Sequence, residues 1–281
     1  MFDQELAALT KKLETDPKNP DLCKEVGNLF FHHQQYERAI EYYQKAIDLN
    51  PGFYKALYNL GNTYYKLDQF EKAVHYWHEA IEVRPDFDHA HFNLGYHYYH
   101  KGFLREAANE LQKAAQINPK TPDTHHYLGL CYHQMNQLQK AIEEFRTAIT
   151  LAGDTPEPDY HYNLANTSYD LSDFETAASE WSVTLKLRPT DLKARNNFCD
   201  ALLQLGRIDE ASSEIEIVLR EDPEYPPAVC TKAELLERLG KPEQARELFM
   251  KVISLTDKKE NWELLSRYVK EKLASPPTVQ S

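Results

Sequence analysis

A pattern of small, aromatic and large apolar positions recurs along this chain with a period of 34 residues. Residues 54–87 carry a Leu-Gly pair, an aromatic residue, Ala, a large apolar residue, Ala and Pro. These are Leu60, Gly61, Tyr64, Ala73, Trp77, Ala80 and Pro85. Residues 88–121 repeat this skeleton with Leu94, Gly95, Tyr98, Ala107, Leu111, Ala114 and Pro119. A fixed period of this length predicts a solenoid of small helical units that pack on their neighbours.

Seven copies of the pattern follow one another, at residues 20–53, 54–87, 88–121, 122–157, 158–191, 192–225 and 226–259. Counted from the first residue of each copy, position 20 is always Ala and position 8 is Gly, Ala or Cys. Position 24 is large, and it is Tyr43, Trp77, Leu111, Phe145, Trp181, Ile215 and Phe249. Small residues opposite large ones let two helices approach closely, so each copy is expected to be a pair of packed helices.

Two amphipathic segments flank the copies. Their apolar residues recur at helical spacing, and they are Phe2, Leu6, Leu9 and Leu13 in the first segment and Trp262, Leu265, Val269 and Leu273 in the second. The spacing predicts capping helices within 1–19 and over 260–274, which would cover the ends of the stack. Residues 275–281 are expected to be a flexible tail. The alternative for the last helix is dimerisation through Trp262.

Copy 4 is two residues longer than the others, and Gly153 takes the place of the usual Pro. This loop, at 152–158, is either a tolerated extension or a hinge between copies 1–4 and 5–7. Copies 5–7 also depart from the pattern, for example with Ser168 at an aromatic position. The second half is therefore expected to be less stable locally.

The repeated residues resemble those of the tetratricopeptide repeat family, over about nine tenths of the chain. The resemblance implies an all-α fold, a right-handed α-α superhelical solenoid of seven helix-turn-helix repeats with N- and C-terminal capping helices. It also implies a surface that holds other proteins, with no catalytic chemistry. The sequence contains no Gly-rich phosphate loop and no nucleophile elbow, which agrees with a protein that is not an enzyme.

The composition and the N-terminal residues argue against several classes of partner and of cellular location. The formal net charge of −12 argues against nucleic acid, which needs a basic face. The first residues have neither the basic nor the apolar region of a signal peptide, and the apolar runs are too short to span a membrane. The four cysteines, Cys23, Cys131, Cys199 and Cys230, have no CxxC spacing and are expected to be reduced. We therefore expect a cytoplasmic protein.

The resemblance implies that the first helix of each copy lines a concave groove through positions 2, 5, 6, 9, 12 and 13. The candidate peptide-binding residues at these positions are Lys24, Asn28, Lys55, Tyr58, Asn59, Asn62, Tyr65, Phe92, Asn93, Tyr96, Tyr99, His126, Tyr127, Tyr162, Asn163, Asn166 and Asn197. A carboxamide both donates and accepts, so a row of asparagines can pair with an extended peptide backbone. The tyrosines suit apolar or proline-containing side chains. The alternative is that asparagines and tyrosines only join neighbouring helices.

One variant of the family carries a carboxylate clamp for acidic C-terminal tails. Lys24, Asn28 and Asn59 match its first two copies. The third copy should supply two cations, but His89 and Asn93 stand there. The clamp is therefore incomplete in this chain.

Histidines gather in copies 3–5, with His91, His125 and His161 at position 4. A metal site is one interpretation, but no HExxH spacing is present and position 4 normally packs between repeats. Another hypothesis is that protonation of these histidines weakens packing or partner binding near pH 6.

These patterns favour a non-catalytic adaptor that binds a peptide segment of a partner protein in the groove. The partner is expected to be a protein or peptide, with no nucleic acid, membrane insertion or cofactor, and the chain is expected to be a monomer or weak dimer. The alternatives are an assembly scaffold that self-associates through its terminal helix, and a co-chaperone-type carboxylate clamp.

Overall fold

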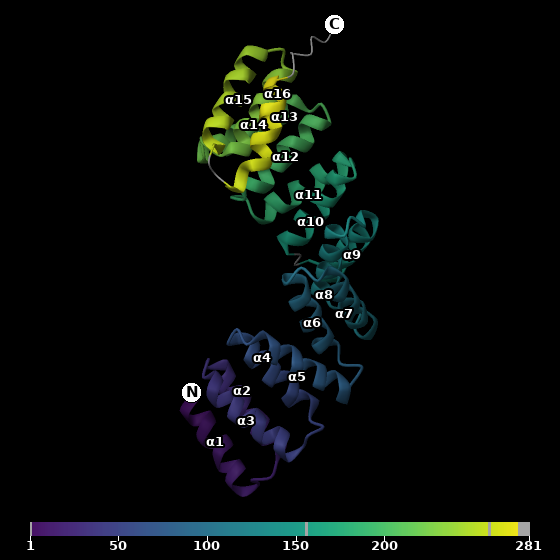
Figure 1. Cartoon of the computed structure of the whole chain (residues 1–281), viewed down its shortest axis with the longest axis vertical. Helices are drawn as coiled ribbons and strands as arrows, with labels where there is room; N and C mark the ends of the chain where they lie inside the picture. Colours follow the sequence, from purple (N-terminus) through teal and green to yellow (C-terminus); the bar gives the residue numbers. More distant parts are fainter. Residues whose placement is uncertain (1, 155–156, 258–259, 275–281) are drawn as a thin grey trace. The chain divides into compact units, whose positions relative to one another are not determined.

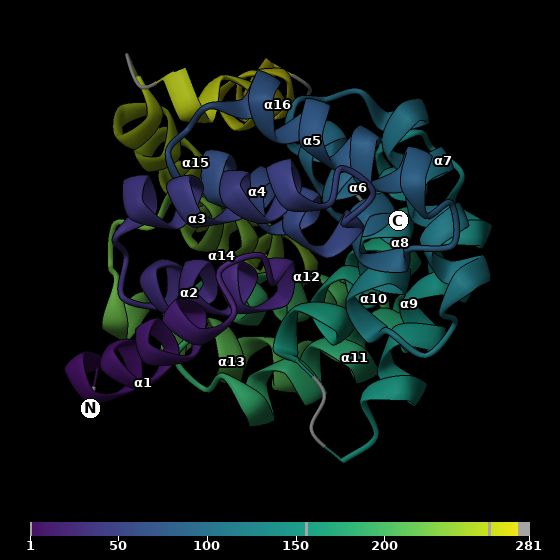
Figure 2. The same cartoon turned by 90° about the horizontal axis from the view of Figure 1, so that it is seen from below.

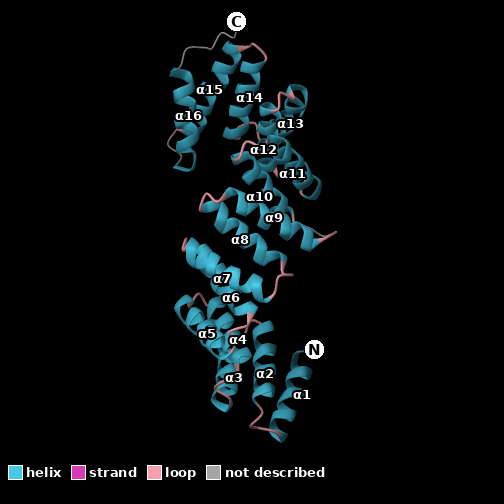
Figure 3. Cartoon of the chain, turned by 90° about the vertical axis from the view of Figure 1, so that its right-hand side faces the viewer, coloured by secondary structure: helices cyan, strands magenta, loops and turns pink. Residues whose placement is uncertain are grey.

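The computed structural model describes residues 2–154, 157–257 and 260–274, and all regular structure within them is helical (Figure 3). The helices of the first half are α1 (Phe2–Thr15), α2 (Pro20–His32), α3 (Tyr36–Leu49), α4 (Tyr54–Lys66), α5 (Phe70–Val83), α6 (Asp88–His100), α7 (Leu104–Ile117) and α8 (Pro122–Gln134). Those of the second half are α9 (Leu138–Ala152), α10 (Pro158–Asp170), α11 (Phe174–Leu187), α12 (Leu192–Gln204), α13 (Ile208–Glu221), α14 (Pro226–Arg238), α15 (Pro242–Thr256), the 3₁₀ turn η1 (Glu260–Trp262) and α16 (Glu263–Ala274). The all-α, helix-turn-helix prediction is confirmed.

The chain separates into two compact units, Met1–Asn136 (unit 1) and Gln137–Ser281 (unit 2). Within each unit, successive helices pack in pairs, such as α2 with α3 and α4 with α5 in unit 1 (Figures 1 and 2). In unit 2, α10 packs with α11 and α14 with α15. The first helix of each pair begins at the residue from which the sequence pattern was counted, such as Tyr54 for α4.

Close contact inside each pair depends on the small residue at position 8. In α4, a Cβ added to Gly61 would lie 2.6 Å from Cδ1 of Trp77 on α5, too close for any side chain. Both Trp77 and the position-20 residue Ala73 are buried. The small residue at position 8 therefore sets how closely α4 packs on α5, and with it which face of α4 is turned away from α5.

The turn inside each pair has a left-handed residue that sequence analysis did not single out. Position 15 of every copy has a φ between 57° and 79°, and its residues are Gln34, Asp68, Gly102, Asn136, Ser172, Gly206 and Gly240. In the third copy, Gly102 N–H bonds to Tyr99 C=O and Phe103 N–H to Tyr98 C=O. These bonds satisfy the last carbonyls of the first helix.

The flanking helices bury the apolar faces that the sequence predicts. Phe2, Leu6 and Leu9 pack on α2 and α3, with the Phe2 and Phe30 rings 5.9 Å apart. At the other end Val269 is buried, with Leu265 and Leu273 against the same cluster. Trp262, the proposed dimerisation residue, contacts Tyr225 inside unit 2. The predicted tail at 275–281, and residues 155–156 of the candidate hinge, lie outside the described residues.

All four cysteines are free and buried. Burial raises the pKa of each thiol, that of Cys131 to about 12. No helix in the described parts of the chain has both the length and the apolar character needed to cross a membrane.

Candidate functional site

Asparagines at positions 9 and 6 pair across neighbouring copies of unit 1. Nδ2 of Asn59 on α4 donates to Oδ1 of Asn28 on α2 at 2.8 Å, and the Tyr43 hydroxyl donates to the same oxygen at 2.8 Å. The position-9 side chain is thus held by the large residue of its own copy and by the asparagine of the next copy. The interhelical interpretation of these asparagines holds for this pair.

The second pair repeats this geometry on α4 and α6. Nδ2 of Asn93 donates to Oδ1 of Asn62 at 2.7 Å and to the Tyr58 hydroxyl at 3.2 Å. The indole Nε1 of Trp77 donates to Oδ1 of Asn62 at 2.9 Å. Burial raises the pKa of Tyr58, against the opposing hydrogen bonds with Asn62 and Asn93. Tyr58 therefore stays a neutral partner of Asn93 at physiological pH.

These interhelical bonds use only part of each carboxamide. Nδ2 of Asn28, and Oδ1 of Asn59 and of Asn93, have no hydrogen-bond partner among the described residues. Nδ2 of Asn62 donates one of its two hydrogens to the Tyr58 hydroxyl and keeps the other. None of these atoms is fully buried, and all four side chains are partly exposed. Each pair therefore offers one donor group and one acceptor group, held in place by the bonds behind them.

A pocket of about 210 Å³ opens beside the first pair. Its lining residues are Asn28, Phe31, His32, Tyr43, Asn59 and Asn62. Phe31 and His32 were not among the sequence candidates. They lie at positions 12 and 13, which the groove pattern includes, so the repeat register itself was the signal that could have found them.

Aromatic candidates of copies 2–4 gather into one cluster within unit 1, formed by Tyr65, Phe92, Tyr96, Tyr99, His100 and Tyr127. Ring centroids lie 5.0 Å apart for Tyr96 and Tyr127, 6.0 Å for Phe92 and Tyr127, and 6.5 Å for Tyr65 and Tyr96. All but the exposed His100 are partly buried. Burial raises the pKa of Tyr127, with a further contribution from the Tyr96 hydroxyl. The cluster is a partly exposed aromatic surface.

The candidates Lys24, Lys55 and His126 differ in their exposure and in the residues that they contact. Nζ of Lys24 lies 3.1 Å from Asp21 Oδ1 and 5.4 Å from the Phe53 ring centroid. Lys55 is exposed and lies over the Tyr54 ring at 5.9 Å. His126 is buried, with 9% of its surface exposed, so it is not an open groove residue. Lys24 therefore has a carboxylate partner already, which weakens the case for a clamp around Asn28 and Asn59.

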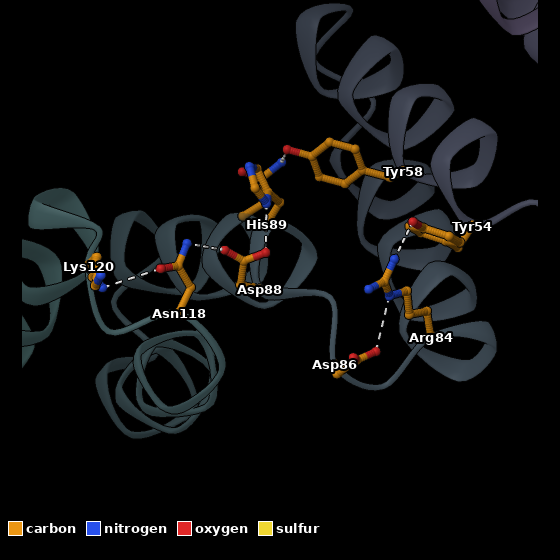
Figure 4. A network of polar contacts seen from close by, with 9 residues as sticks. Tyr54, Tyr58, Arg84, Asp86, Asp88, His89, Asn118 and Lys120 are labelled. Atoms are coloured by element: carbon orange, nitrogen blue, oxygen red, sulfur yellow. Dashed lines mark hydrogen bonds and ion pairs between the residues drawn. The ribbon is translucent and has the colours of Figure 1, made fainter.

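A polar network joins copies 2 and 3 beside the second asparagine pair (Figure 4). Arg84 lies between the Tyr54 hydroxyl and Asp86, while Asp88 accepts from Asn118 at 2.8 Å and lies 2.7 Å from His89 Nδ1. Burial raises the pKa of Asp88, but the bonds from Asn118 and His89 outweigh it and hold that pKa below its ordinary value. His89, a residue of the clamp comparison, is thus tied to Asp88.

In unit 2, Tyr162 and Asn166 on α10 face Asn197 on α12. Nδ2 of Asn197 donates to the Tyr162 hydroxyl at 3.3 Å and to Asn166 Oδ1 at 3.4 Å. Nδ2 of Asn166 and Oδ1 of Asn197 have no partner among the described residues. Asn163 is partly exposed on the same helix.

The position-4 histidines form bridges rather than a metal site. His91 is buried, and its Nδ1 lies 2.6 Å from Glu110 Oε2 while its Nε2 lies 3.0 Å from the Pro85 carbonyl. Both partners are acceptors, so both ring nitrogens must carry a proton for both contacts to be hydrogen bonds. Arg195, at the same position of copy 6, bonds to Glu214 and to the Pro189 carbonyl. For His91 the geometry thus argues against the hypothesis that protonation weakens packing.

His161 repeats the carboxylate half of this bridge, with Nδ1 2.6 Å from Glu180 Oε2. His125 repeats the carbonyl half, with Nε2 3.0 Å from the Pro119 oxygen. Within the part of the chain that the structure describes, no three His, Cys, Asp or Glu side chains are grouped closely enough to hold a metal ion.

Comparison with solved structures identifies the same architecture in other proteins. A structure described as YrrB, a TPR protein with an unusual peptide-binding site, aligns with a TM-score of 0.59 and 20% identity, over 69% of this chain and 97% of that chain. Pseudomonas aeruginosa PilF aligns with a TM-score of 0.64 and 18% identity, over 78% and 98%. A tetratricopeptide repeat protein from Parabacteroides merdae gives 0.59 and 17%, over 89% and 98%. At these identities the likeness concerns the fold.

Family models give the more specific result. Models described as tetratricopeptide repeat match residues 54–87, 122–155 and 197–258, and a model described as TPR repeat matches 27–68 and 95–136. Together they span well over half of the chain, and two of the matches, 54–87 and 122–155, begin at the first residue of α4 and of α8. The chain belongs to the tetratricopeptide repeat family.

Proposed function

We propose that this chain is a non-catalytic adaptor that binds an extended segment of a partner protein on the surface formed by the first helices of its repeats. The observation that carries the proposal is the half-used carboxamide pair. In each pair, the position-6 carbonyl oxygen has no partner among the described residues, and the position-9 amide group keeps at least one N–H hydrogen beyond the bonds that hold the side chain. An extended peptide backbone presents N–H and C=O groups that match this set.

Preorganisation supports this interpretation. The bonds from Tyr43 and Asn59 fix the orientation of the Asn28 carboxamide, and those from Trp77 and Asn93 fix that of Asn62. A side chain that is already ordered loses less conformational entropy on binding, which favours affinity. The aromatic cluster on α4, α6 and α8 adds contact area for apolar or proline-containing side chains.

A peptide selection tests the proposal. A phage-displayed library of random dodecapeptides is selected on the wild-type chain, and enriched peptides are synthesised and measured on Asn28→Asp/Asn62→Asp. Each aspartate keeps the acceptor oxygen used behind it but replaces the outward NH₂ with a carboxylate oxygen. Binding should fall by about tenfold or more, since each lost hydrogen bond is worth about 1 kcal/mol.

The matched control is Asn109→Asp, which makes the same chemical change at an exposed position of α7. It should leave affinity unchanged. If no peptide is enriched, or if both variants bind as the wild type does, the proposal fails. The enriched peptides are measured with both free and amidated C-termini, because a carboxylate clamp requires the free acid and the backbone site does not.

Self-association is a second candidate function, favoured by exposed apolar side chains near the C-terminal end of unit 2. Leu264 on α16 is 76% exposed, Met250 on α15 is 50% exposed, and Leu239 is 45% exposed. Sedimentation over a range of concentrations tests this candidate. A dimer that Leu264→Glu dissociates would support it, and a monomer at every concentration would exclude it.

A further inference from the structure

The binding motif of unit 1 occurs a second time in unit 2. Residues 58–65 read YNLGNTYY and residues 162–169 read YNLANTSY, and the following copy supplies Asn93 in one case and Asn197 in the other. The two segments occupy the same positions of their copies, on α4 and α10. Among the seven copies in the sequence, only copies 2 and 5 carry this motif.

The two motifs also make the same hydrogen bonds. Asn93 donates to the Tyr58 hydroxyl at 3.2 Å and to Asn62 Oδ1 at 2.7 Å. Asn197 donates to the Tyr162 hydroxyl at 3.3 Å and to Asn166 Oδ1 at 3.4 Å. In both, the carbonyl oxygen at position 6 of the next copy is left without a partner among the described residues. The position-9 amide group of Asn166 has no partner there either, and that of Asn62 keeps one hydrogen beside its bond to the Tyr58 hydroxyl. Because the two motifs offer the same kinds of donor and acceptor, we expect them to bind the same kind of ligand.

The row of carboxamides is interrupted between the motifs. Position 9 is Tyr96 in copy 3 and Leu130 in copy 4, and position 6 of copy 4 is Tyr127. None of these side chains can supply both a donor and an acceptor in the manner of a carboxamide: Leu130 has no polar atom, and Tyr96 and Tyr127 present a ring. The sequence thus separates two amide sites that a continuous ladder would join.

We propose that the chain carries two separate sites for extended polypeptide segments, one on α4 and α6 of unit 1 and one on α10 and α12 of unit 2. This inference rests on the proposed function, and adds that one chain holds two segments of the same backbone chemistry. A partner with two such segments, or two partner molecules, then binds one chain. A partner with two such segments binds more tightly overall, because its second segment then binds intramolecularly.

The sites differ in the residue that the last tyrosine of the motif contacts. In unit 1 the ring of Tyr65 lies 6.5 Å from that of Tyr96, at position 9 of the next copy. In unit 2 the Tyr169 hydroxyl donates to Asp200, at the equivalent position, at 2.5 Å. Both sites are therefore expected to bind a peptide backbone in the same way. The surface beside the asparagines is aromatic in unit 1 and carries a carboxylate in unit 2. The two affinities for one peptide should differ.

Calorimetric stoichiometry tests the inference, with synthetic dodecapeptides enriched from the random library on the full chain. The wild type should bind two peptides per chain. Asn62→Asp and Asn166→Asp should each bind one, and the double variant should bind none. Asn109→Asp should bind two, as the wild type does. Helical circular dichroism and melting confirm that each variant is folded.

A wild-type stoichiometry of one would overturn the two-site inference without any variant, and would leave the proposed function standing if either single variant abolished that binding. Loss of all binding in one single variant, with no change in the other, would overturn the two-site inference in the same way. Undiminished binding by the double variant would overturn the proposed function itself, and the two-site inference with it.

Discussion

At the scale of single residues, the two asparagine motifs differ at two positions, Gly61 against Ala165 and Tyr64 against Ser168. Copy 2 has Gly61 where copy 5 has Ala165, and a Cβ at Gly61 would lie 2.7 Å from Nε1 of Trp77. The indole of Trp77 bonds to Asn62. That of Trp181, the equivalent residue beside Ala165, is buried without a hydrogen-bond partner among the described residues. Ala165 carries the Cβ that, at Gly61, would clash with an indole placed as that of Trp77 is.

This difference predicts unequal effects of one substitution. Trp77→Phe removes a hydrogen bond and leaves the Asn62 oxygen with one donor fewer, whereas Trp181→Phe removes an indole N–H that has no partner among the described residues. Trp77→Phe should therefore lower the free energy of unfolding by about 1 kcal/mol more than Trp181→Phe. Urea denaturation followed by circular dichroism measures both. Equal losses would show that Asn62 is not a partner of Trp77.

The His91 bridge gives a second prediction at this scale. Because Arg195 makes the same two contacts in copy 6, His91→Arg should keep most of the stability. His91→Ala leaves Glu110 and the Pro85 carbonyl without this donor, and should cost about 3 kcal/mol, as when one partner of a buried pair is removed. His89→Ala, at an exposed neighbour, is the control. Similar melting temperatures for His91→Ala and His89→Ala would contradict the bridge.

Glu110 predicts the pH dependence of the same bridge. Burial raises its pKa from the ordinary value of 4.5, but hydrogen bonds from His91 and Lys113 outweigh burial and hold that pKa lower. A depressed carboxyl pKa contributes stability that is present above 4.5 and is lost as the pH falls through the folded-state value. The stability difference between the wild type and Glu110→Gln should thus shrink from pH 7 to acid pH. A constant difference would exclude an ionised Glu110.

At the scale of elements, the helix pair could be predicted from the sequence because its determinants are local. The Pro that ends one copy, the small residue at position 8 and the large residue at position 24 set where helices begin and how closely they pack. The asparagine bonds could not be predicted, since both interpretations of Asn59 and Asn93 used the same face of the helix. The side-chain geometry shows that the amide group of each bonds to the preceding repeat, while the carbonyl oxygen has no partner among the described residues.

The left-handed turn residue gives the prediction at this scale. Gly102 has a φ of 79°, and a Cβ there would meet no atom within 4 Å. Gly102→Ala should therefore destabilise through the backbone alone, by about 1 kcal/mol. Ser172 already has a side chain at a φ of 61°, so Ser172→Gly should not destabilise. Melting temperatures measure both. If Ser172→Gly lowers the melting temperature as much as Gly102→Ala does, the prediction is contradicted.

At the scale of the whole molecule, the 34-residue repeat and its resemblance to the tetratricopeptide repeat family predicted the fold class, and the resemblance implied that the first helices carry the candidate residues. The register did not predict that the amide row is divided, although Tyr96, Tyr127 and Leu130 were its visible signal. Nor did it predict that His126 is buried, because burial at that position depends on how one first helix packs on the next. Each of the two compact units contains an asparagine pair that is hydrogen-bonded across neighbouring repeats.

Side-chain amide resonances test the central claim most directly. The NH₂ of Asn28 has no partner among the described residues, and that of Asn62 uses only one of its two hydrogens, on the Tyr58 hydroxyl. Asn109 is exposed on α7. Adding an enriched dodecapeptide to ¹⁵N-labelled protein should shift the NH₂ signals of Asn28 and Asn62 and leave that of Asn109 in place. Saturating peptide that moves neither of the first two signals would contradict backbone recognition by these carboxamides.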